Sequence, residues 1–176
     1  SWHGLHWQQM APGDGGTCFY LKIHPRDPNR VIESKDMGGT YITTDGSRTY
    51  QSVNDPDWTF PRLHYLNSLD FCQARPDVGY AVSDGNGAFK TTDRGLSWTP
   101  LDTAALDNLC PGKTRQPLST VAVNPDNPDE VWVGTGLPRP PGRGGERRFQ
   151  NGLGHSTDGG KTWMHVADAF PRDAML

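Results

Sequence analysis

The stretch Ser156-Thr157-Asp158-Gly159-Gly160-Lys161-Thr162-Trp163 is the most complete of three copies of one pattern, and the others occupy residues 91–98 and 43–50. In each copy a hydroxyl residue and an Asp precede a Gly-containing bend, which is followed by a second hydroxyl residue and a large aromatic. The Asp side chain can accept hydrogen bonds from the amides of the turn, and Gly adopts positive φ without steric cost. Each copy therefore predicts a β-hairpin turn whose aromatic starts the next strand and points into a core. The Asp and the aromatic residue of each copy are predicted to have a structural role: Asp45 with Tyr50, Asp93 with Trp98, and Asp158 with Trp163.

The pattern recurs with a period of 48 residues in the first two units. Leu21 stands 24 positions before Asp45, and Leu69 stands 24 positions before Asp93. In the third unit the distance from Val121 to Asp158 is 37 positions, and the 13 additional residues fall in residues 136–151. That segment contains three Pro and four Arg, which predicts an exposed loop.

Each unit contains four short apolar runs that predict β-strands. The first unit has strands at residues 19–23, 31–34, 40–43 and 49–53, with a tight loop at 24–30. Runs at residues 68–72, 80–83 and 88–91 and at residues 120–123 and 131–134 repeat the order. Four short strands per repeat are typical of a β-propeller blade, and a closed ring takes roughly four to eight blades.

The predicted fold class is therefore all-β, an arc of about three four-stranded blades from a larger propeller. We expect one partial propeller domain over residues 1–176, with the last strand of a preceding blade at 1–12 and blades at 13–53, 54–101 and 102–170. The third blade carries the inserted loop 136–151. The remaining blades of a longer chain are the first expected partners.

The composition gives no reason to expect a nucleic-acid or membrane partner. Lys and Arg number 17 against 20 Asp and Glu, for a net charge of -3, and no apolar run reaches the length that spans a membrane. The three Cys, Cys18, Cys72 and Cys110, lack metal-ligand spacing, so we expect no metal and no cofactor. They are predicted to be small buried residues, and a disulfide between two of them stays open as an alternative.

The eight-residue pattern resembles the Asp-box, or BNR, repeat of sialidases, sortilin-like receptors and several glycoside hydrolases. Because strand direction alternates, the three box turns lie at one end of the blades. The turns between the second and third strands lie at the other end, together with the connections between blades. Catalytic or binding groups are expected at that second rim, on loops held by rigid strands.

The segment 33–41, with Asp36 before Gly38-Gly39, resembles the first blade of the xyloglucanases of glycoside hydrolase family 74, as do Gly15-Gly16 and residues 24–31. In that family the Asp before the Gly pair is one of two catalytic carboxylates of an inverting hydrolase. The resemblance implies that Asp36 is a general base that activates water, with a β-glucan or xyloglucan as substrate. It also implies an extracellular or periplasmic location and a partner acid in a later blade, so this chain alone is expected to be inactive.

A structural role is the alternative for Asp36. Asp84 stands nine residues before Asp93 just as Asp36 stands nine residues before Asp45, and an Asp that begins a Gly-containing turn needs no catalytic role. Both roles stay open for Asp36, whereas a turn-forming role is favoured for Asp84, which we also keep as a substrate-binding candidate. Ser34-Lys35 departs from the family pattern and leaves the substrate open.

Aromatic residues gather in the first connection between blades: Trp58, Phe60, His64 and Tyr65. Their rings can stack on sugars or seal the junction between blades. Sealing is favoured for most of them, Trp58 is the best candidate for stacking, and Tyr65 is a further substrate-binding candidate. The arginines of the inserted loop could bind carboxylates or phosphates, but a solvated loop is favoured for Arg139, Arg143, Arg147 and Arg148.

Sialidase activity is not supported, because Phe60-Pro61-Arg62-Leu63 does not match the Arg-x-Pro signature of that family in order or place. Two hypotheses remain. The chain belongs to a carbohydrate-active hydrolase-like propeller, or it belongs to a non-catalytic Asp-box propeller that serves as a binding or assembly scaffold. Similarity of fold alone does not separate them.

Overall fold

The computed structural model of the chain describes residues 18–35, 39–53, 63, 66–83, 86–109, 118–135 and 152–166. These residues form three four-stranded sheets. The first sheet contains β1 (Cys18–His24), β2 (Asp27–Lys35), β3 (Gly39–Thr43) and β4 (Gln51–Ser52). The second contains β5 (Leu66–Phe71), β6 (Gly79–Ser83), β7 (Gly87–Thr91) and β8 (Thr99–Pro100). The third contains β9 (Leu118–Val123), β10 (Val131–Thr135), β11 (Gly152–Ser156) and β12 (Met164–His165).

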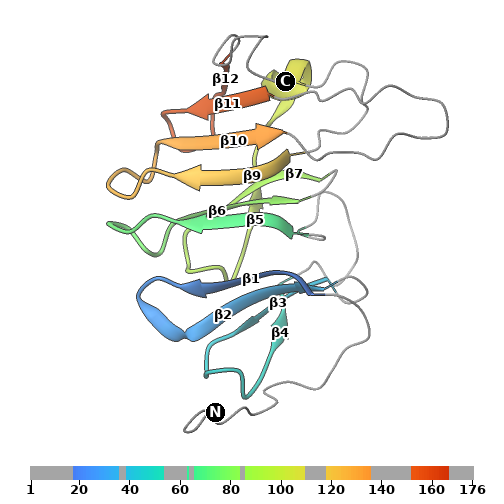
Figure 1. Cartoon of the computed structure of the whole chain (residues 1–176). Coiled ribbons are helices and arrows are strands. Elements are labelled where there is room, and N and C mark those ends of the chain that lie inside the picture. Colours follow the sequence, from blue (N-terminus) through green and yellow to red (C-terminus); the bar gives the residue numbers. More distant parts are fainter. Residues whose placement is uncertain are drawn as a thin grey trace, which may run out of the picture.

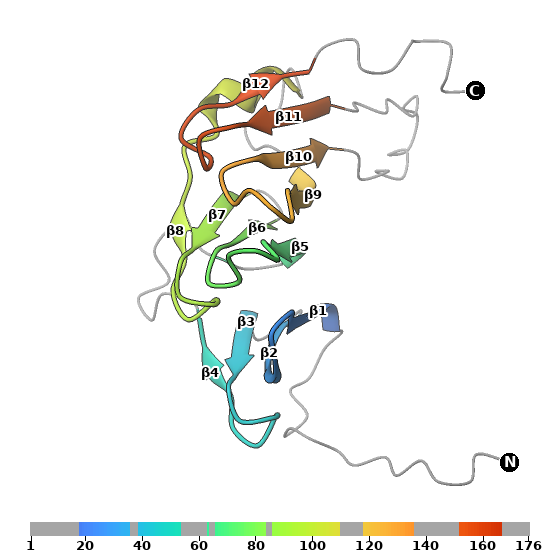
Figure 2. The ribbon, with the colours of Figure 1, turned by 90° about the vertical axis from the view of Figure 1, so that its left-hand side faces the viewer.

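Each sheet is a simple antiparallel meander in which every strand pairs with the next one along the chain. The three sheets follow one another along an arc (Figure 1). The first strands β1, β5 and β9 lie next to one another, and the last strands β4, β8 and β12 lie on the opposite side of the arc (Figure 2). The predicted all-β propeller arc of three four-stranded blades is confirmed.

The core lies between the sheets rather than within any one of them. One buried cluster joins Ile32 and Ile42 of the first sheet to residues of the second, among them Leu69, Phe71 and Phe89. The other joins the second sheet to the third and includes Tyr80, Val82, Val121, Val131 and Val133. Because each sheet buries its apolar faces against its neighbours, the stability of the arc depends on the contacts between blades.

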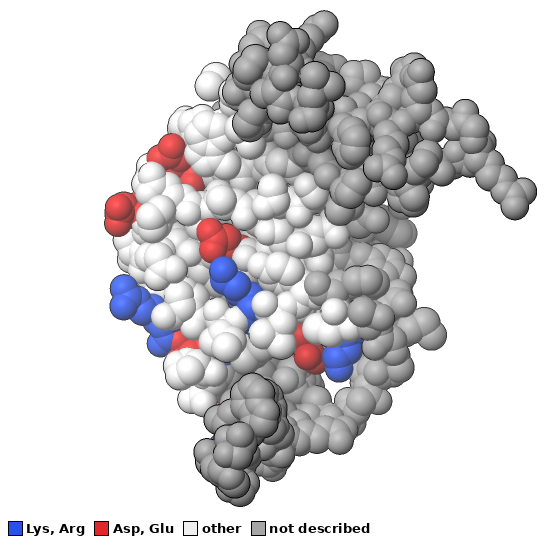
Figure 3. All heavy atoms as spheres, in the orientation of Figure 1, with Lys and Arg blue, Asp and Glu red and all other residues white. Residues whose placement is uncertain are grey.

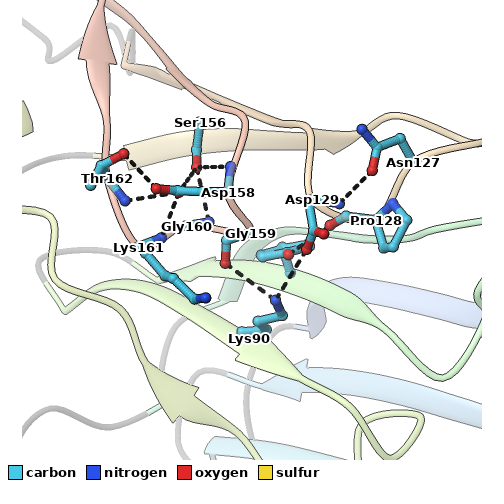
Figure 4. Close-up of polar contacts among 11 residues, drawn as sticks. Lys90, Asn127, Pro128, Asp129, Ser156, Asp158, Gly159, Gly160, Lys161 and Thr162 are labelled. Atoms are coloured by element: carbon cyan, nitrogen blue, oxygen red, sulfur yellow. Dashed lines mark hydrogen bonds and ion pairs between the residues drawn. The ribbon is translucent and has the colours of Figure 1, made fainter.

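The three predicted turns share one set of hydrogen bonds (Figure 4 shows the third). In the third turn Ser156 Oγ donates to Asp158 Oδ1 at 2.9 Å and accepts the Gly160 amide at 2.9 Å. The other side of the Asp158 carboxylate holds Thr162, whose amide donates to Oδ1 at 2.9 Å and whose hydroxyl donates to Oδ2 at 2.6 Å. Thr43 with Asp45 and Thr91 with Asp93 repeat the arrangement.

Two consecutive residues of each turn have positive φ. The pairs are Gly46 and Ser47, Arg94 and Gly95, and Gly159 and Gly160. Since Gly alone adopts this conformation at little cost, the third copy, with two Gly, is the least strained. In the second and third turns the aromatic that follows packs at a sheet interface, because Trp163 is buried in one core cluster and Trp98 packs against the other. The expected packing role is thus confirmed for both Trp residues.

The turns are also tied to the hairpin between the first two strands of the same sheet. The amide one residue after each Asp donates to that hairpin: Gly46 to Asn29, Arg94 to Asp77, and Gly159 to Asp129, with N to O distances of 2.9, 3.1 and 2.8 Å. The end of the blade that carries the turns is therefore a closed, hydrogen-bonded scaffold.

The expected loop at residues 24–30 is wrong in extent, because β2 begins at Asp27 rather than Val31. His24 pairs with Asp27 across a two-residue turn, with a register shift between Ile23 and His24. The imidazole fixes this turn, since Nδ1 accepts the Arg26 amide at 3.3 Å and Nε2 donates to the Pro76 carbonyl of the next sheet at 2.8 Å.

A short 3-10 helix, η1 (Ala104–Leu109), lies in the connection to the third sheet and was not predicted. Asp102 Oδ1 accepts the Ala104 amide at its start, at 3.0 Å. Leu106 is fully buried and meets Gly154 of β11. Six residues are too short a run to show a helical period in the sequence.

The expected burial of the cysteines is right for Cys72 and wrong for Cys18, which is exposed at the start of β1. Both are free thiols. Several expectations concern residues outside the described ranges: the strand at 1–12, Gly15-Gly16, the aromatic residues Phe60 and His64, Cys110, and the inserted loop 136–151 with its arginines.

We predict that the turn carboxylates make stability fall in acid. A hydrogen bond from the Thr162 hydroxyl, followed by one from the Thr162 amide, lowers the pKa of Asp158 from 3.8 to about 2, and Thr49 does the same for Asp45. A carboxylate with a lowered folded pKa stabilises the fold above its ordinary pKa, and this stabilisation is lost as the pH falls through the folded value. The melting temperature should therefore drop as the pH falls from 3.8 toward 2.

Thermal unfolding followed by circular dichroism checks this prediction. Asp158→Asn should lower the melting temperature at neutral pH and flatten the acid decline, whereas Asp126→Asn, in an exposed loop, should change neither. An Asp158→Asn protein with the pH profile of the unmodified chain would contradict the role of the carboxylate.

Candidate functional site

The end of the arc opposite the three turns is the predicted site. We call it the site rim and define it by the last residue pairs between the second and third strands: Lys35 with Gly39, Ser83 with Gly87, and Thr135 with Gly152. All three pairs lie at the same end of their sheets, on the right in Figure 1. The arc therefore brings three equivalent strand ends to one side.

The residues proposed from the sequence as catalytic or substrate-binding lie outside the described ranges. They are Asp36, Trp58, Tyr65 and Asp84. In the chain, Asp36 stands between Lys35 and Gly39, and Asp84 stands between Ser83 and Asn86. Their roles stay predictions, and the geometry that bears on them is that of the strand ends on either side.

The strand end before Asp36 is fixed to the next sheet. Ser34 Oγ accepts the Thr40 hydroxyl at 3.4 Å and the Leu66 amide at 3.1 Å, and Ser34, Thr40 and Leu66 are all fully buried. A buried hydroxyl shared by two sheets holds both the β2–β3 hairpin and the start of β5. A group placed at this hairpin thus stands on a rigid support.

Two charged side chains beside this hairpin, Lys35 and Glu33, form an ion pair. Lys35 Nζ lies 3.2 Å from Glu33 Oε1 and 5.9 Å from the ring centre of Tyr41. Both charged side chains are largely buried, with exposed fractions of 13% for Lys35 and 11% for Glu33. The ammonium is thus compensated by a carboxylate of its own strand, and Tyr41 adds a cation–π contact.

Backbone conformation explains why a Gly begins the third strand in two of the hairpins at the site rim. Gly39 has φ of 87° and Gly87 has φ of 86°, so both occupy the left-handed region at the start of the third strand. A side chain is strained there, which accounts for the second Gly of the Gly38-Gly39 pair. Because both hairpins share this requirement, the Gly residues alone do not distinguish a catalytic Asp36 from a turn-forming one.

A set of polar contacts between the first strands β1, β5 and β9 was not predicted from the sequence. Asp70 of β5 accepts Lys22 Nζ of β1 on Oδ1 at 3.1 Å and the Val123 amide of β9 on Oδ2 at 3.2 Å. One carboxylate therefore joins all three sheets. Lys22 and Asp70 are 48 residues apart, the length of the repeat, so their opposite charges at equivalent positions were the available signal.

Among the described residues no group of three or more His, Cys, Asp or Glu could hold a metal ion. On the face seen in Figure 3, acidic and basic side chains of the described part are interspersed rather than gathered by sign. In the same part of the chain, no helix is long and apolar enough to cross a membrane.

No protein-family model matches the sequence. The chain is 26% identical over 192 aligned residues to a probable oligoxyloglucan-reducing end-specific xyloglucanase of Neosartorya fischeri, an alignment that covers 96% of the chain and 20% of that protein. The chain thus spans about one fifth of the length of this relative.

Solved structures with a similar fold are β-propellers. An ancestral GH74 enzyme aligns with a TM-score of 0.59 and 19% identity, covering 89% of this chain and 19% of that one. YCF48 from Cyanidioschyzon merolae aligns with a TM-score of 0.57 and 16% identity, covering 92% of this chain and 40% of that one. At these identities the structural matches establish the fold, and the sequence match adds a likeness to glycoside hydrolase propellers.

We predict that Asp70 contributes more to stability than its partly exposed position suggests. Asp70→Ala removes charge-assisted hydrogen bonds to two neighbouring sheets and should lower the free energy of unfolding by about 1–3 kcal/mol. Asp70→Asn can still accept the Val123 amide and should cost less. Urea unfolding measures both, and Asp126→Ala in an exposed loop should stay within about 0.5 kcal/mol of the unmodified chain. Equal effects of Asp70→Ala and Asp126→Ala would contradict this role.

Proposed function

We propose that this chain is part of a carbohydrate-active propeller of the glycoside hydrolase type, an inverting endo-β-glucanase or xyloglucanase. The observation that carries the proposal is the 26% identity to a xyloglucanase along 96% of the chain. Because the alignment spans nearly all of the arc, it includes the hairpin with Asp36 as well as the turns that any such propeller would share.

In this proposal Asp36 is the general base. It accepts a proton from a water molecule that attacks the anomeric carbon, while a second carboxyl group protonates the leaving oxygen from the other side of the sugar. In an inverting enzyme the two groups stand about 6.5–9.5 Å apart, which leaves room for the water. The second group belongs to a later blade, so the chain by itself lacks hydrolytic activity.

The support for Asp36 comes from the strand ends that flank it. The buried Ser34 hydroxyl fixes the hairpin to the second sheet, and the ammonium of Lys35 is already paired with Glu33. A base must be positioned rigidly to take a proton, so a hairpin that is fixed to the neighbouring sheet suits this role. Trp58, Tyr65 and Asp84 are proposed to contact the polysaccharide.

Further parts of the proposal follow from the same likeness. The three turns are Asp-box repeats, the blades divide at about residues 53 and 101, and the protein is exported to the extracellular or periplasmic space. The shared hydrogen bonds of Asp45, Asp93 and Asp158 support the repeat assignment.

The second candidate function is a non-catalytic scaffold that binds or assembles other proteins. A similar fold, YCF48, has been solved bound to a D1 peptide, and the match to it over 88% of the chain favours this candidate. In this candidate function Asp36 and Asp84 are both turn formers, which the common left-handed Gly of the two hairpins permits.

The full-length protein that contains this chain separates the two functions. We predict that Asp36→Asn lowers the rate of reducing-sugar release from xyloglucan or another β-glucan by about 10²–10⁴-fold, the contribution typical of a general base. Asp126→Asn, in an exposed loop between β9 and β10, is the control and should keep the hydrolytic rate.

Circular dichroism must show both variants folded. Equal rates for Asp36→Asn and the unmodified protein would remove Asp36 from catalysis. An unmodified protein that releases no sugar from any β-glucan would favour the scaffold.

A further inference from the structure

The first hairpin at the site rim differs from the second in the residues that pair just inside it. Ser34 pairs with Thr40 in the first sheet, and Val82 pairs with Ala88 at the same register in the second. All four residues are buried, at 2% exposure or less. Two hydroxyls therefore lie in the core of the first hairpin, at positions that the equivalent hairpin fills with apolar side chains. We call Ser34 and Thr40 the hydroxyl pair.

The fold of a blade does not require the hydroxyl pair. At the same register of the third sheet Gly134 pairs with Leu153, and neither residue carries a hydroxyl. Burying a hydroxyl costs free energy that its hydrogen bonds must offset, whereas an apolar pair carries no such cost. Since the other two sheets form this strand pairing without hydroxyls, a constraint specific to the first hairpin must account for them.

The hydrogen bonds of the pair reach the next sheet. Ser34 Oγ accepts the Thr40 hydroxyl at 3.4 Å and the Leu66 amide at 3.1 Å. In the chain, Ser34 and Thr40 stand two residues before and four residues after Asp36, and Leu66 directly follows Tyr65. One buried oxygen thus joins both strands of the hairpin that carries the proposed base to the end of the connection that carries the proposed sugar contacts.

The second hairpin is held by contacts of a different kind. Asn86 donates its backbone amide to the Ser83 carbonyl and its side-chain amide to the Ser83 hydroxyl, both at 3.2 Å and both within the hairpin. Val82 and Ala88 belong to the apolar cluster between the second and third sheets. Both hairpins have the left-handed Gly, so the hydroxyl pair distinguishes the first from the second where the Gly does not.

We propose that Ser34 and Thr40 are positioning residues for the hydrolytic reaction, an inference that rests on the proposed function of Asp36 as the general base. The two hydroxyls fix the hairpin to the start of β5, so the base keeps a constant place relative to the connection before β5. A base acts only within hydrogen-bond reach of its water, and a displacement of about 1 Å can cost about 100-fold in rate. The cost of two buried hydroxyls is therefore offset by the placement of the base.

The full-length protein that contains this chain tests the proposal through kcat and KM for sugar release from xyloglucan or another β-glucan. Ser34→Ala should lower kcat by about 10–100-fold, because the base is displaced but still present. KM should change much less, since both hydroxyls are fully buried and cannot contact the polysaccharide. Thr40→Val keeps the shape of the side chain without the hydroxyl and should also lower kcat, whereas Thr40→Ser keeps the hydroxyl and should retain it.

Ser68→Ala is the matched control. Ser68 Oγ accepts the Val121 amide at 3.2 Å between the second and third sheets, as Ser34 Oγ accepts the Leu66 amide between the first and second. The control removes the same kind of hydrogen bond at the other junction and should keep kcat. Thermal unfolding followed by circular dichroism shows that each variant is folded at the assay temperature, and Thr40→Val carries the test if Ser34→Ala does not fold.

Combination with Asp36→Asn separates positioning from stability. If Ser34 acts through the base, Ser34→Ala should cause no further loss of kcat in the Asp36→Asn protein, whereas a general weakening of the fold would lower kcat equally in both backgrounds. Equal losses in both backgrounds, or Ser34→Ala and Thr40→Val proteins that keep kcat, would overturn this proposal and leave Asp36 as the base. An unmodified protein that releases no sugar, or an Asp36→Asn protein as active as the unmodified one, would instead contradict the proposed function and this inference with it.

Discussion

An Asp carboxylate that closes a turn on itself is the interaction on which the arc depends. In each sheet it receives an amide and a hydroxyl from the residue four positions later, and a second hydroxyl from the residue two positions earlier. The turn amides that would otherwise lack partners are thereby satisfied without water. The same turn also binds the hairpin of its own sheet and, in the second and third sheets, contacts the preceding sheet, so one side chain fixes local structure and the junction between blades together.

The two ends of the sheets differ in structure as a result of this constraint. The turn end is closed by short-range hydrogen bonds, and the inner strands are joined by Asp70, which reaches both neighbouring sheets. The site rim carries connections of different lengths, with three residues between the second and third strands in the first two sheets and 16 in the third. The turn end is therefore rigid, whereas the loops at the site rim differ from sheet to sheet. In such an arrangement the function can change while the fold is kept.

Much of the fold could be predicted from the sequence, because the sequence patterns that determine it are local and repeated. The box pattern gave the turns, and the 48-residue spacing gave the sheets and the equivalence of their positions. What escaped depends on contacts between sheets: His24 tightens its hairpin through Pro76, Leu106 anchors a short helix on Gly154, and Asp70 joins three strands. The predicted burial of Cys18 is wrong, because the residue type does not show which face of a sheet is covered by a neighbouring sheet. For the site, the sequence named Asp36, Trp58, Tyr65 and Asp84 from resemblance and turn position, and their roles remain proposals that depend on groups beyond the rim.

The most direct test of the central claim is residue-resolved amide hydrogen exchange at Ser97 and Thr162, whose N–H groups are bound by Asp93 and Asp158. If the turns are locked into the junctions, these amides exchange as slowly as that of Val121, whose N–H is bound by Ser68 of the neighbouring sheet. Exchange of Ser97 and Thr162 at the rate of an unprotected peptide amide would show that the turns open independently of the junctions, and would contradict the claim.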